Sequence, residues 1–379
     1  MRHLTTAKWR TYSRFRMILR PAIASALQGK LVAAPDRYRP NPAAYEAYLK
    51  GRHYLLSFSL GGVERARGYF EEAIALDRKF AQAYSGLGRY FFERAAMGWT
   101  PAHETMPMIR TALTKALDLD PVLPEARGML GAVAALYEYD WTEAERHFRM
   151  AVAVEPVPVE VLYEYARCLT FSGRAGAALT QVRKALDQDP LNVLLRYWMG
   201  VTLHALGRDD EGLIEVSRAL EAVPHFAFYN EIAMAHASQG KFSEAMAAAE
   251  RAVAIAPAED KIAPAILAGL LKVTGDGADR ALALLDRLDS RVYGTAIGFA
   301  VYHLICGEVD QAVDWVVKSI EERYLGTLYF TNASPLSRSL RSSPRWPQAG
   351  ENDEFAGERF VTGWKRGSVQ VAFLLNFPD

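Results

Sequence analysis

The chain has 379 residues, with 44 Lys or Arg and 44 Asp or Glu, so its formal net charge is zero. A balanced charge excludes a global basic field that would attract nucleic acid. Half of the residues are hydrophobic, which excludes a wholly disordered chain, and two cysteines are too few for a disulfide framework. Length alone predicts two or three domains of about 150 residues each.

The first 42 residues are strongly basic, because they contain nine Lys or Arg and one Asp. Arg20 and Pro21 interrupt the apolar stretch at 17–27, so this segment lacks the continuous apolar core of a signal peptide. An organellar transit peptide stays open as an alternative, but we expect residues 1–42 to be a solvated basic leader or linker. No stretch approaches 18 uncharged apolar residues, so we expect no membrane span and a cytoplasmic location.

A repeat of about 34 residues runs through most of the chain. Proline recurs at intervals of 33 to 35 residues, at Pro121, Pro156, Pro190, Pro224 and Pro257. Glycine recurs at intervals of 32 to 35 residues, at Gly173, Gly207, Gly240, Gly275 and Gly307. Internal repeats at such a period are typical of solenoid proteins.

The clearest repeat unit is 191–224, and its special positions have physical reasons. Gly200 lies where the two helices of a hairpin would touch, so a larger side chain would push them apart. Gly207 can adopt a positive φ and end the first helix. Pro224 lacks an N–H group and ends the second helix.

This pattern resembles the tetratricopeptide repeat (TPR) family, in which each unit is a pair of antiparallel helices. The resemblance implies an all-α, right-handed superhelical solenoid of about eight helix-turn-helix repeats. Stacked units bury their apolar faces on their neighbours, so we expect one continuous array over 43–323. The expected units are 43–80, 81–121, 122–156, 157–190, 191–224, 225–257, 258–291 and 292–323.

Two segments depart from the period. The second unit contains about nine extra residues around 95–103, where we expect Trp99 to fold back over a hydrophobic face. Residues 324–379 abandon the repeat, and we expect an irregular tail with one short helix near 336–340. The apolar stretch 369–377 could pack on the last helices as a cap, and 348–359 reads as polar and flexible.

Three segments suggest a narrower resemblance, namely 39–51, the second unit at 87–121, and 340–345. They are similar to the C-terminal TPR arrays of large bacterial signalling proteins. In that group the array follows a class III nucleotide cyclase, a serine/threonine kinase or a winged-helix regulator. None of these effector domains is recognised in this sequence.

Motifs of catalysis are missing from the sequence, which has no G-x-x-x-x-G-K-[ST], G-x-S-x-G or H-E-x-x-H pattern. His103-Glu104 lacks the second histidine of a zinc site. Cys168 and Cys306 fall in the first helices of separate units, where we expect buried, unreactive thiols. We therefore expect no catalytic residue, no cofactor and no metal ion, and we predict that the protein is not an enzyme.

In the TPR family the first helix of each unit lines a concave groove, and this resemblance implies the binding residues. The implied groove residues are Tyr48, Arg52, Arg89, Phe92, Tyr163, Arg167, Phe171, Tyr197, His204 and Asn230. Arg and Tyr are enriched in interface hot spots, although any one of these residues could instead pack within or between repeats. The Lys and Asn carboxylate clamp of chaperone-binding TPR proteins is absent from these positions.

We therefore predict a non-catalytic scaffold that binds a protein or peptide partner in the concave groove. The alternative is the sensory or oligomerisation half of a signalling enzyme or transcription regulator whose effector domain is not in this chain. Self-association stays open, and we expect no nucleic-acid partner, because the basic leader lacks the spaced aromatic residues of a single-strand platform.

Overall fold

The computed structural model describes residues 38–55, 60–340 and 342–346. The chain divides into two compact regions, Met1–Asn41 and Pro42–Asp379, and every helix described below belongs to the second region. Most of the expected leader therefore lies outside the described residues.

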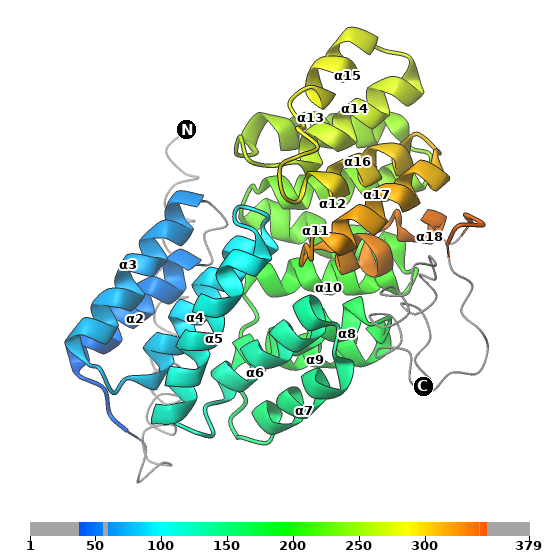
Figure 1. Cartoon of the computed structure of the whole chain (residues 1–379). Helices are drawn as coiled ribbons and strands as arrows, with labels where there is room; N and C mark the ends of the chain where they lie inside the picture. The colour runs from blue at the N-terminus through cyan, green and yellow to red at the C-terminus, as the bar shows by residue number, and fades with distance from the viewer. Residues whose placement is uncertain (1–37, 56–59, 341, 347–379) are drawn as a thin grey trace, which may run out of the picture. The chain divides into compact units, whose positions relative to one another are not determined.

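Eight consecutive helix pairs make up most of the described part of this second region (Figure 1). Their bounds are α2 Pro42–Leu55 with α3 Leu60–Leu76, α4 Ala81–Ala96 with α5 Ala102–Leu119, α6 Pro124–Val133 with α7 Trp141–Val152, α8 Val159–Phe171 with α9 Ala175–Gln188, α10 Val193–Ala205 with α11 Asp209–Ala222, α12 Phe226–Ser238 with α13 Phe242–Ile255, α14 Ile262–Thr274 with α15 Ala278–Leu285, and α16 Thr295–Ile305 with α17 Val309–Glu321. No β-strand occurs among the described residues. The predicted all-α repeat solenoid is confirmed.

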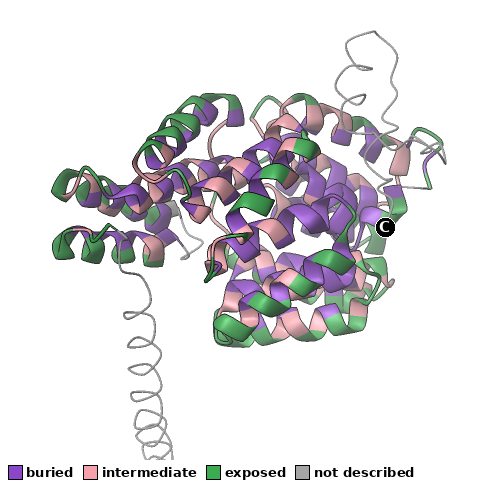
Figure 2. Cartoon of the chain, turned by 90° about the horizontal axis from the view of Figure 1, so that it is seen from below, coloured by how far each residue is buried: buried purple, intermediate pink, exposed green. Residues whose placement is uncertain are grey.

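Small residues allow the helices of a pair to touch, as the repeat pattern predicts. A methyl group added to Gly200 on α10 would lie 2.5 Å from Val216 Cγ2 and 2.9 Å from the backbone oxygen of Gly212 on α11. Gly207, between these helices, has a φ of +74°, which L side chains rarely adopt. The buried positions lie on the helix faces that turn toward neighbouring helices (Figure 2).

The extra residues of the second unit lengthen its helices instead of forming a long loop. Helices α4 and α5 have 16 and 18 residues, against 13 and 14 in α10 and α11. The connection is only 97–101, and Trp99 in it is half-buried against the hydrophobic cluster of the first unit.

The third unit ends its first helix irregularly. A π-helix, η1, continues α6 over Ala134–Glu138, and Tyr139 follows it in the left-handed conformation with a φ of 59°. The Tyr139 ring is buried, and the Arg323 guanidinium lies over it at 4.9 Å from the ring centroid. A residue from the end of the array thus packs on the third unit.

Residues 324–346, here called the C-terminal segment, fold back along the array. The segment contains a π-helix, η2, over Tyr329–Ala333 and a short helix, α18, over Ser337–Leu340. Its helix α18 packs on α17, and η2 packs on α8 and α10, which the sequence did not predict. The tail stretches 348–359 and 369–377 lie outside the described residues.

Contacts between distant repeat units join the second and third units to the end of the array. Lys261 Nζ donates to the backbone oxygen of Gly98 at 3.4 Å. Arg323 Nη1 donates to the backbone oxygen of Tyr137 at 2.7 Å. Leu325 and Leu328 share a hydrophobic cluster with residues of α4 to α10. None of the described helices is both long enough and apolar enough to cross a membrane.

Candidate functional site

The ten groove residues implied by the TPR resemblance lie on the first helices of their pairs. Tyr48 and Arg52 are on α2, Arg89 and Phe92 on α4, Tyr163, Arg167 and Phe171 on α8, Tyr197 and His204 on α10, and Asn230 on α12. Two cavities lie among these helices, and the predicted residues divide between them.

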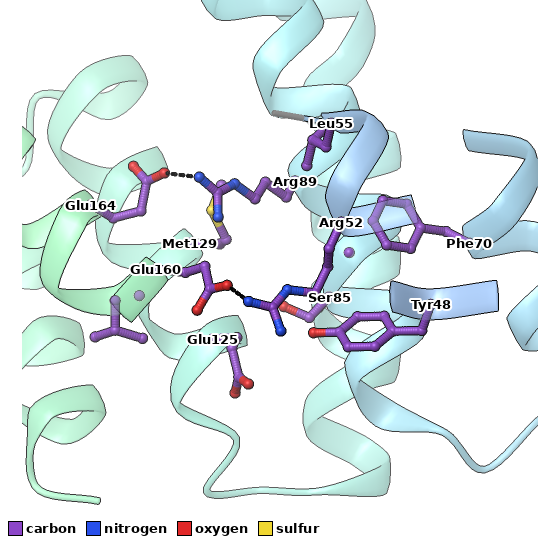
Figure 3. Close-up of a pocket in the computed structure, with 13 residues that line it drawn as sticks. Tyr48, Arg52, Leu55, Phe70, Ser85, Arg89, Glu125, Met129, Glu160 and Glu164 are labelled. Atoms are coloured by element: carbon purple, nitrogen blue, oxygen red, sulfur yellow. Dashed lines mark ion pairs between the residues drawn. The ribbon is translucent and has the colours of Figure 1, made fainter. Parts of the chain in front are cut away.

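The first cavity, here called the N-terminal pocket, lies between α2, α4, α6 and α8 (Figure 3). Its volume is about 50 Å³. It is lined by Tyr48, Arg52, Leu55, Phe70, Ser85, Gly86, Arg89, Glu125, Gly128, Met129, Glu160, Val161 and Glu164. The pocket thus combines apolar side chains, small residues and five charged groups.

Ion pairs cross the N-terminal pocket from one wall to the other. Arg52 on α2 pairs with Glu160 on α8, and Arg89 Nη2 lies 3.4 Å from Glu164 Oε1 (Figure 3). The Arg52 side chain is 42% exposed, whereas that of Arg89 is only 12% exposed. Arg52 is therefore the arginine that a partner can reach from solvent.

The second cavity, here called the central cavity, has a volume of about 180 Å³. Its charged lining residues are Arg89, Glu93 and Arg167. Its aromatic lining residues are Trp99, Tyr163, Phe171, Tyr197, Trp198, Phe228, Tyr324, Tyr329 and Phe330. The last three belong to the C-terminal segment, which therefore forms one wall of the cavity.

A buried charge cluster contributes side chains to the walls of both cavities. Glu164, with a side chain only 2% exposed, lies between Arg89 and Arg167, and its Oε2 is 2.5 Å from Arg167 Nη2. The Arg167 guanidinium also lies over the rings of Phe92 and Tyr163, at 5.1 and 5.4 Å from their centroids. Burial raises the pKa of Glu164, although the two arginines oppose this effect.

A second cluster of polar contacts fixes the C-terminal segment to α11 and α12. The Tyr329 hydroxyl donates to Glu231 Oε2, and the Glu231 side chain is fully buried. His204 Nε2 lies 3.8 Å from Glu231 Oε1, and Arg338 Nη2 donates to Asp209 Oδ2 at 2.5 Å. Burial raises the pKa of Glu231 to about 8.

Three implied groove residues have mainly packing surroundings. Phe92 is fully buried beneath Arg167, and Asn230 is 5% exposed. The His204 ring occupies the space beside Gly212, because a methyl group on that glycine would lie 2.7 Å from the ring. The other seven line one of the two cavities.

The sequence did not single out Glu164 or Glu231, although both lie within one residue of a residue that it did. Acidic residues in helices are usually exposed, so their burial here gives no signal in the repeat pattern. Cys168 is buried, and burial raises the pKa of its thiol. Among the described residues, no group of three or more His, Cys, Asp or Glu is arranged to hold a metal ion.

Residues 171–225 and 227–256 match models of the tetratricopeptide repeat family. The chain is 23% identical over 166 residues to the transcriptional regulator HilA of Salmonella typhimurium, which covers 43% of this chain. The match spans only 30% of the length of HilA.

Solved structures of similar fold include the human IFIT1 dimer with PPP-AAAA. Its TM-score is 0.52 at 17% identity, and the match covers 77% of this chain and 75% of that chain. Yeast Tom70 matches with a TM-score of 0.47 at 18% identity, over 83% of this chain and 68% of that chain. The two family matches identify tetratricopeptide repeats within residues 171–256, and the eight helix pairs and the likeness to IFIT1 show the same helical repeat fold.

Proposed function

We propose that this protein is a non-catalytic scaffold that binds a peptide segment of a partner protein at the N-terminal pocket. One observation carries the proposal: this pocket keeps a solvent-accessible arginine, Arg52, whereas the C-terminal segment covers the inner face at α8 and α10. Arginine and tyrosine side chains often supply most of the binding energy of an interface. Arg52 and Tyr48 are such residues, and both line this pocket.

The lining of the pocket defines the peptide that would fit. A volume of about 50 Å³ beside Gly86, Gly128 and Val161 suits one small or branched apolar side chain. Arg52 and Glu160 pair across the rim, so a carboxylate or an amino group of the peptide could replace either partner. We therefore expect an apolar anchor residue flanked by charged residues.

The test begins with selection of binding peptides from a random library displayed on phage. Affinities of the selected peptides are then measured by fluorescence anisotropy for the wild type, Arg52→Ala and Gly128→Ala. The alanine at 128 would lie 3.4 Å from Val161 Cγ2, an ordinary contact, so this variant folds but narrows the pocket. We expect each variant to lose about tenfold in affinity.

A matched control is Arg149→Ala on α7, because the Arg149 side chain is 77% exposed and lines neither cavity. This variant should bind the selected peptides like the wild type. Equal affinity of wild type and Arg52→Ala for every selected peptide would sink the assignment of this pocket.

The similarity to HilA favours a second function, in which the array is the sensory or oligomerisation half of a signalling enzyme or regulator. The test is to sequence the DNA immediately upstream of this reading frame and to co-express whatever it encodes. An adjoining cyclase, kinase or winged-helix frame whose product co-purifies with the array would support this role. An upstream region without such a frame would contradict it.

A further inference from the structure

We propose that the central cavity binds a small aromatic carboxylate, with its ring among the aromatic side chains and its carboxylate at Arg89 and Arg167. This ligand site is distinct from the peptide site proposed above. The two cavities share Leu55 and Arg89, but Arg167 and most of the aromatic side chains that would contact the ligand line the central cavity alone.

The size of the cavity is the first argument. Protein interiors are close-packed and rarely leave voids larger than a water molecule. The central cavity measures about 180 Å³. An engineered apolar cavity of about 150 Å³ is known to bind benzene, so this space accommodates one six-membered ring with a short substituent.

The composition of the wall is the second argument. Phe171 and Trp198 contact each other at a centroid distance of 5.6 Å, with their planes at 60°, and Tyr197 and Phe228 stack at 5.0 Å. Aromatic rings at such distances prefer edge-to-face or offset arrangements. A planar ring placed among them would meet several rings in these favourable geometries.

The sign of the ligand charge follows from the polar groups in the wall. Arg89 and Arg167 line the cavity, and each guanidinium carries five N–H donors. Glu93 is the one acidic residue in the lining, so the charged lining residues carry a net charge of +1. A planar carboxylate is the anion whose shape matches a guanidinium.

Charge balance couples binding to a proton. Two arginines, Arg89 and Arg167, face two carboxylates, Glu93 and Glu164, so an anionic ligand adds a surplus negative charge. Glu164 is the group that takes up a proton, because burial already raises its pKa. The charged groups that face it are Arg167 on its own helix and Arg89 and Glu93 on α4. Because binding is coupled to uptake of a proton, the affinity for the anionic ligand should fall as pH rises.

The experiment uses the full chain and a matched series of probes. Benzoate and phenylacetate are compared with benzyl alcohol, which keeps the ring but lacks the charge, and with acetate, which lacks the ring. Binding is measured by isothermal titration calorimetry and by quenching of tryptophan fluorescence at pH 6, 7 and 8. We expect the aromatic acids to bind at least tenfold more tightly than either control, with affinity falling as pH rises.

Two variants locate the site. Ala227→Leu on α12 adds bulk to the cavity wall without touching either arginine, and it should abolish binding of benzoate. The double variant Glu164→Gln, Arg167→Met removes one charge of each sign, so no unpaired charge is buried, and it should weaken benzoate to the level of benzyl alcohol. Thermal unfolding of each variant reports whether it is folded.

Several results would overturn the proposal. Equal affinities for benzoate and benzyl alcohol would show an apolar cavity that does not recognise the carboxylate. Unchanged binding of benzoate to a folded Ala227→Leu variant would place the ligand elsewhere. Ala227 lines the central cavity and not the N-terminal pocket, so loss of benzoate binding with retained peptide binding separates this site from the peptide site.

Discussion

Glu231 is a carboxyl group enclosed by the C-terminal segment, and its ionisation should make folding depend on pH. Its folded pKa of about 8 lies above the ordinary value of 4.5, because burial disfavours the charged form. The folded protein therefore retains a proton that the unfolded chain releases. The contribution of this proton to the free energy of unfolding is complete below pH 4.5 and is lost as pH rises toward 8.

Glu231→Gln should remove this dependence, because the amide is neutral and its oxygen can still accept from Tyr329. The stability of the variant relative to the wild type should increase between pH 5 and 8, by at most about 1.4 kcal/mol per pH unit. Urea unfolding of both proteins at several pH values measures this difference in unfolding free energy. Burial lowers the pKa of His204, which is present in both proteins. Parallel pH profiles would contradict the prediction.

At the scale of residues, sequence reasoning was most informative for Arg89, Tyr163 and Arg167, because a position within a repeat determines the helix face on which a residue lies. It could not place Glu231 in the interior. That burial depends on Tyr329, which lies 98 positions away and outside the repeat period.

Helix contacts within a pair lead to a prediction about two glycines. Gly200→Ala should destabilise the protein by about 1–3 kcal/mol, because the methyl group meets the rigid backbone of Gly212 at 2.9 Å. Gly68→Ala in the middle of α3 meets nothing within 4 Å and should stabilise by up to about 1 kcal/mol through helix propensity. The denaturant midpoints of both variants are compared with that of the wild type. Shifts of the same sign in the two variants would contradict this prediction.

The C-terminal segment should contribute stability through one buried hydrogen bond. Asn332 Nδ2 donates to the backbone oxygen of Phe171 at 2.6 Å, and Asn332 is 5% exposed. Asn332→Ala leaves that oxygen without its partner and should cost about 1–3 kcal/mol in unfolding free energy. Ser342→Ala, at an exposed position of the same segment, is the control and should be neutral. A neutral Asn332→Ala would mean that the segment is not docked on α8 in solution.

At the scale of elements, the eight helix pairs follow from the 34-residue period because each unit repeats the same apolar and glycine positions. The lengthened α4 and α5 did not follow from it. An insertion at 95–103 reads equally well as a loop or as added helical turns, and packing decides between them. The path of η2 across α8 and α10 likewise has no periodic signal.

The whole array should unfold more cooperatively than an open repeat protein. In an open solenoid each repeat contacts only its neighbours, so distant repeats can unfold separately. Here Arg323 bonds to the third unit and Lys261 to the second. Hydrogen exchange in a urea series should therefore give α4 and α16 the same unfolding free energy.

Removing these two hydrogen bonds should uncouple the unfolding of α16 from that of α4. In the double variant Lys261→Ala, Arg323→Ala, the amides of α16 should exchange at a lower free energy than those of α4, because the contacts that couple the two regions are lost. Neither side chain lies in the core of a helix pair, so the pairs themselves should stay folded. Arg149→Ala should keep the two values equal. Unequal values already in the wild type would show that the distant contacts do not couple the repeats.

The hydrogen bond between Arg323 and Tyr137 can form only late in synthesis of the chain. These residues lie 186 positions apart, and translation proceeds at about 5–20 residues per second. The third unit therefore emerges from the ribosome roughly 10 to 40 s before the arginine that packs on it. Helix α8 likewise lacks its intramolecular cover until η2 follows, so a nascent chain presents to other molecules a surface that the finished protein conceals.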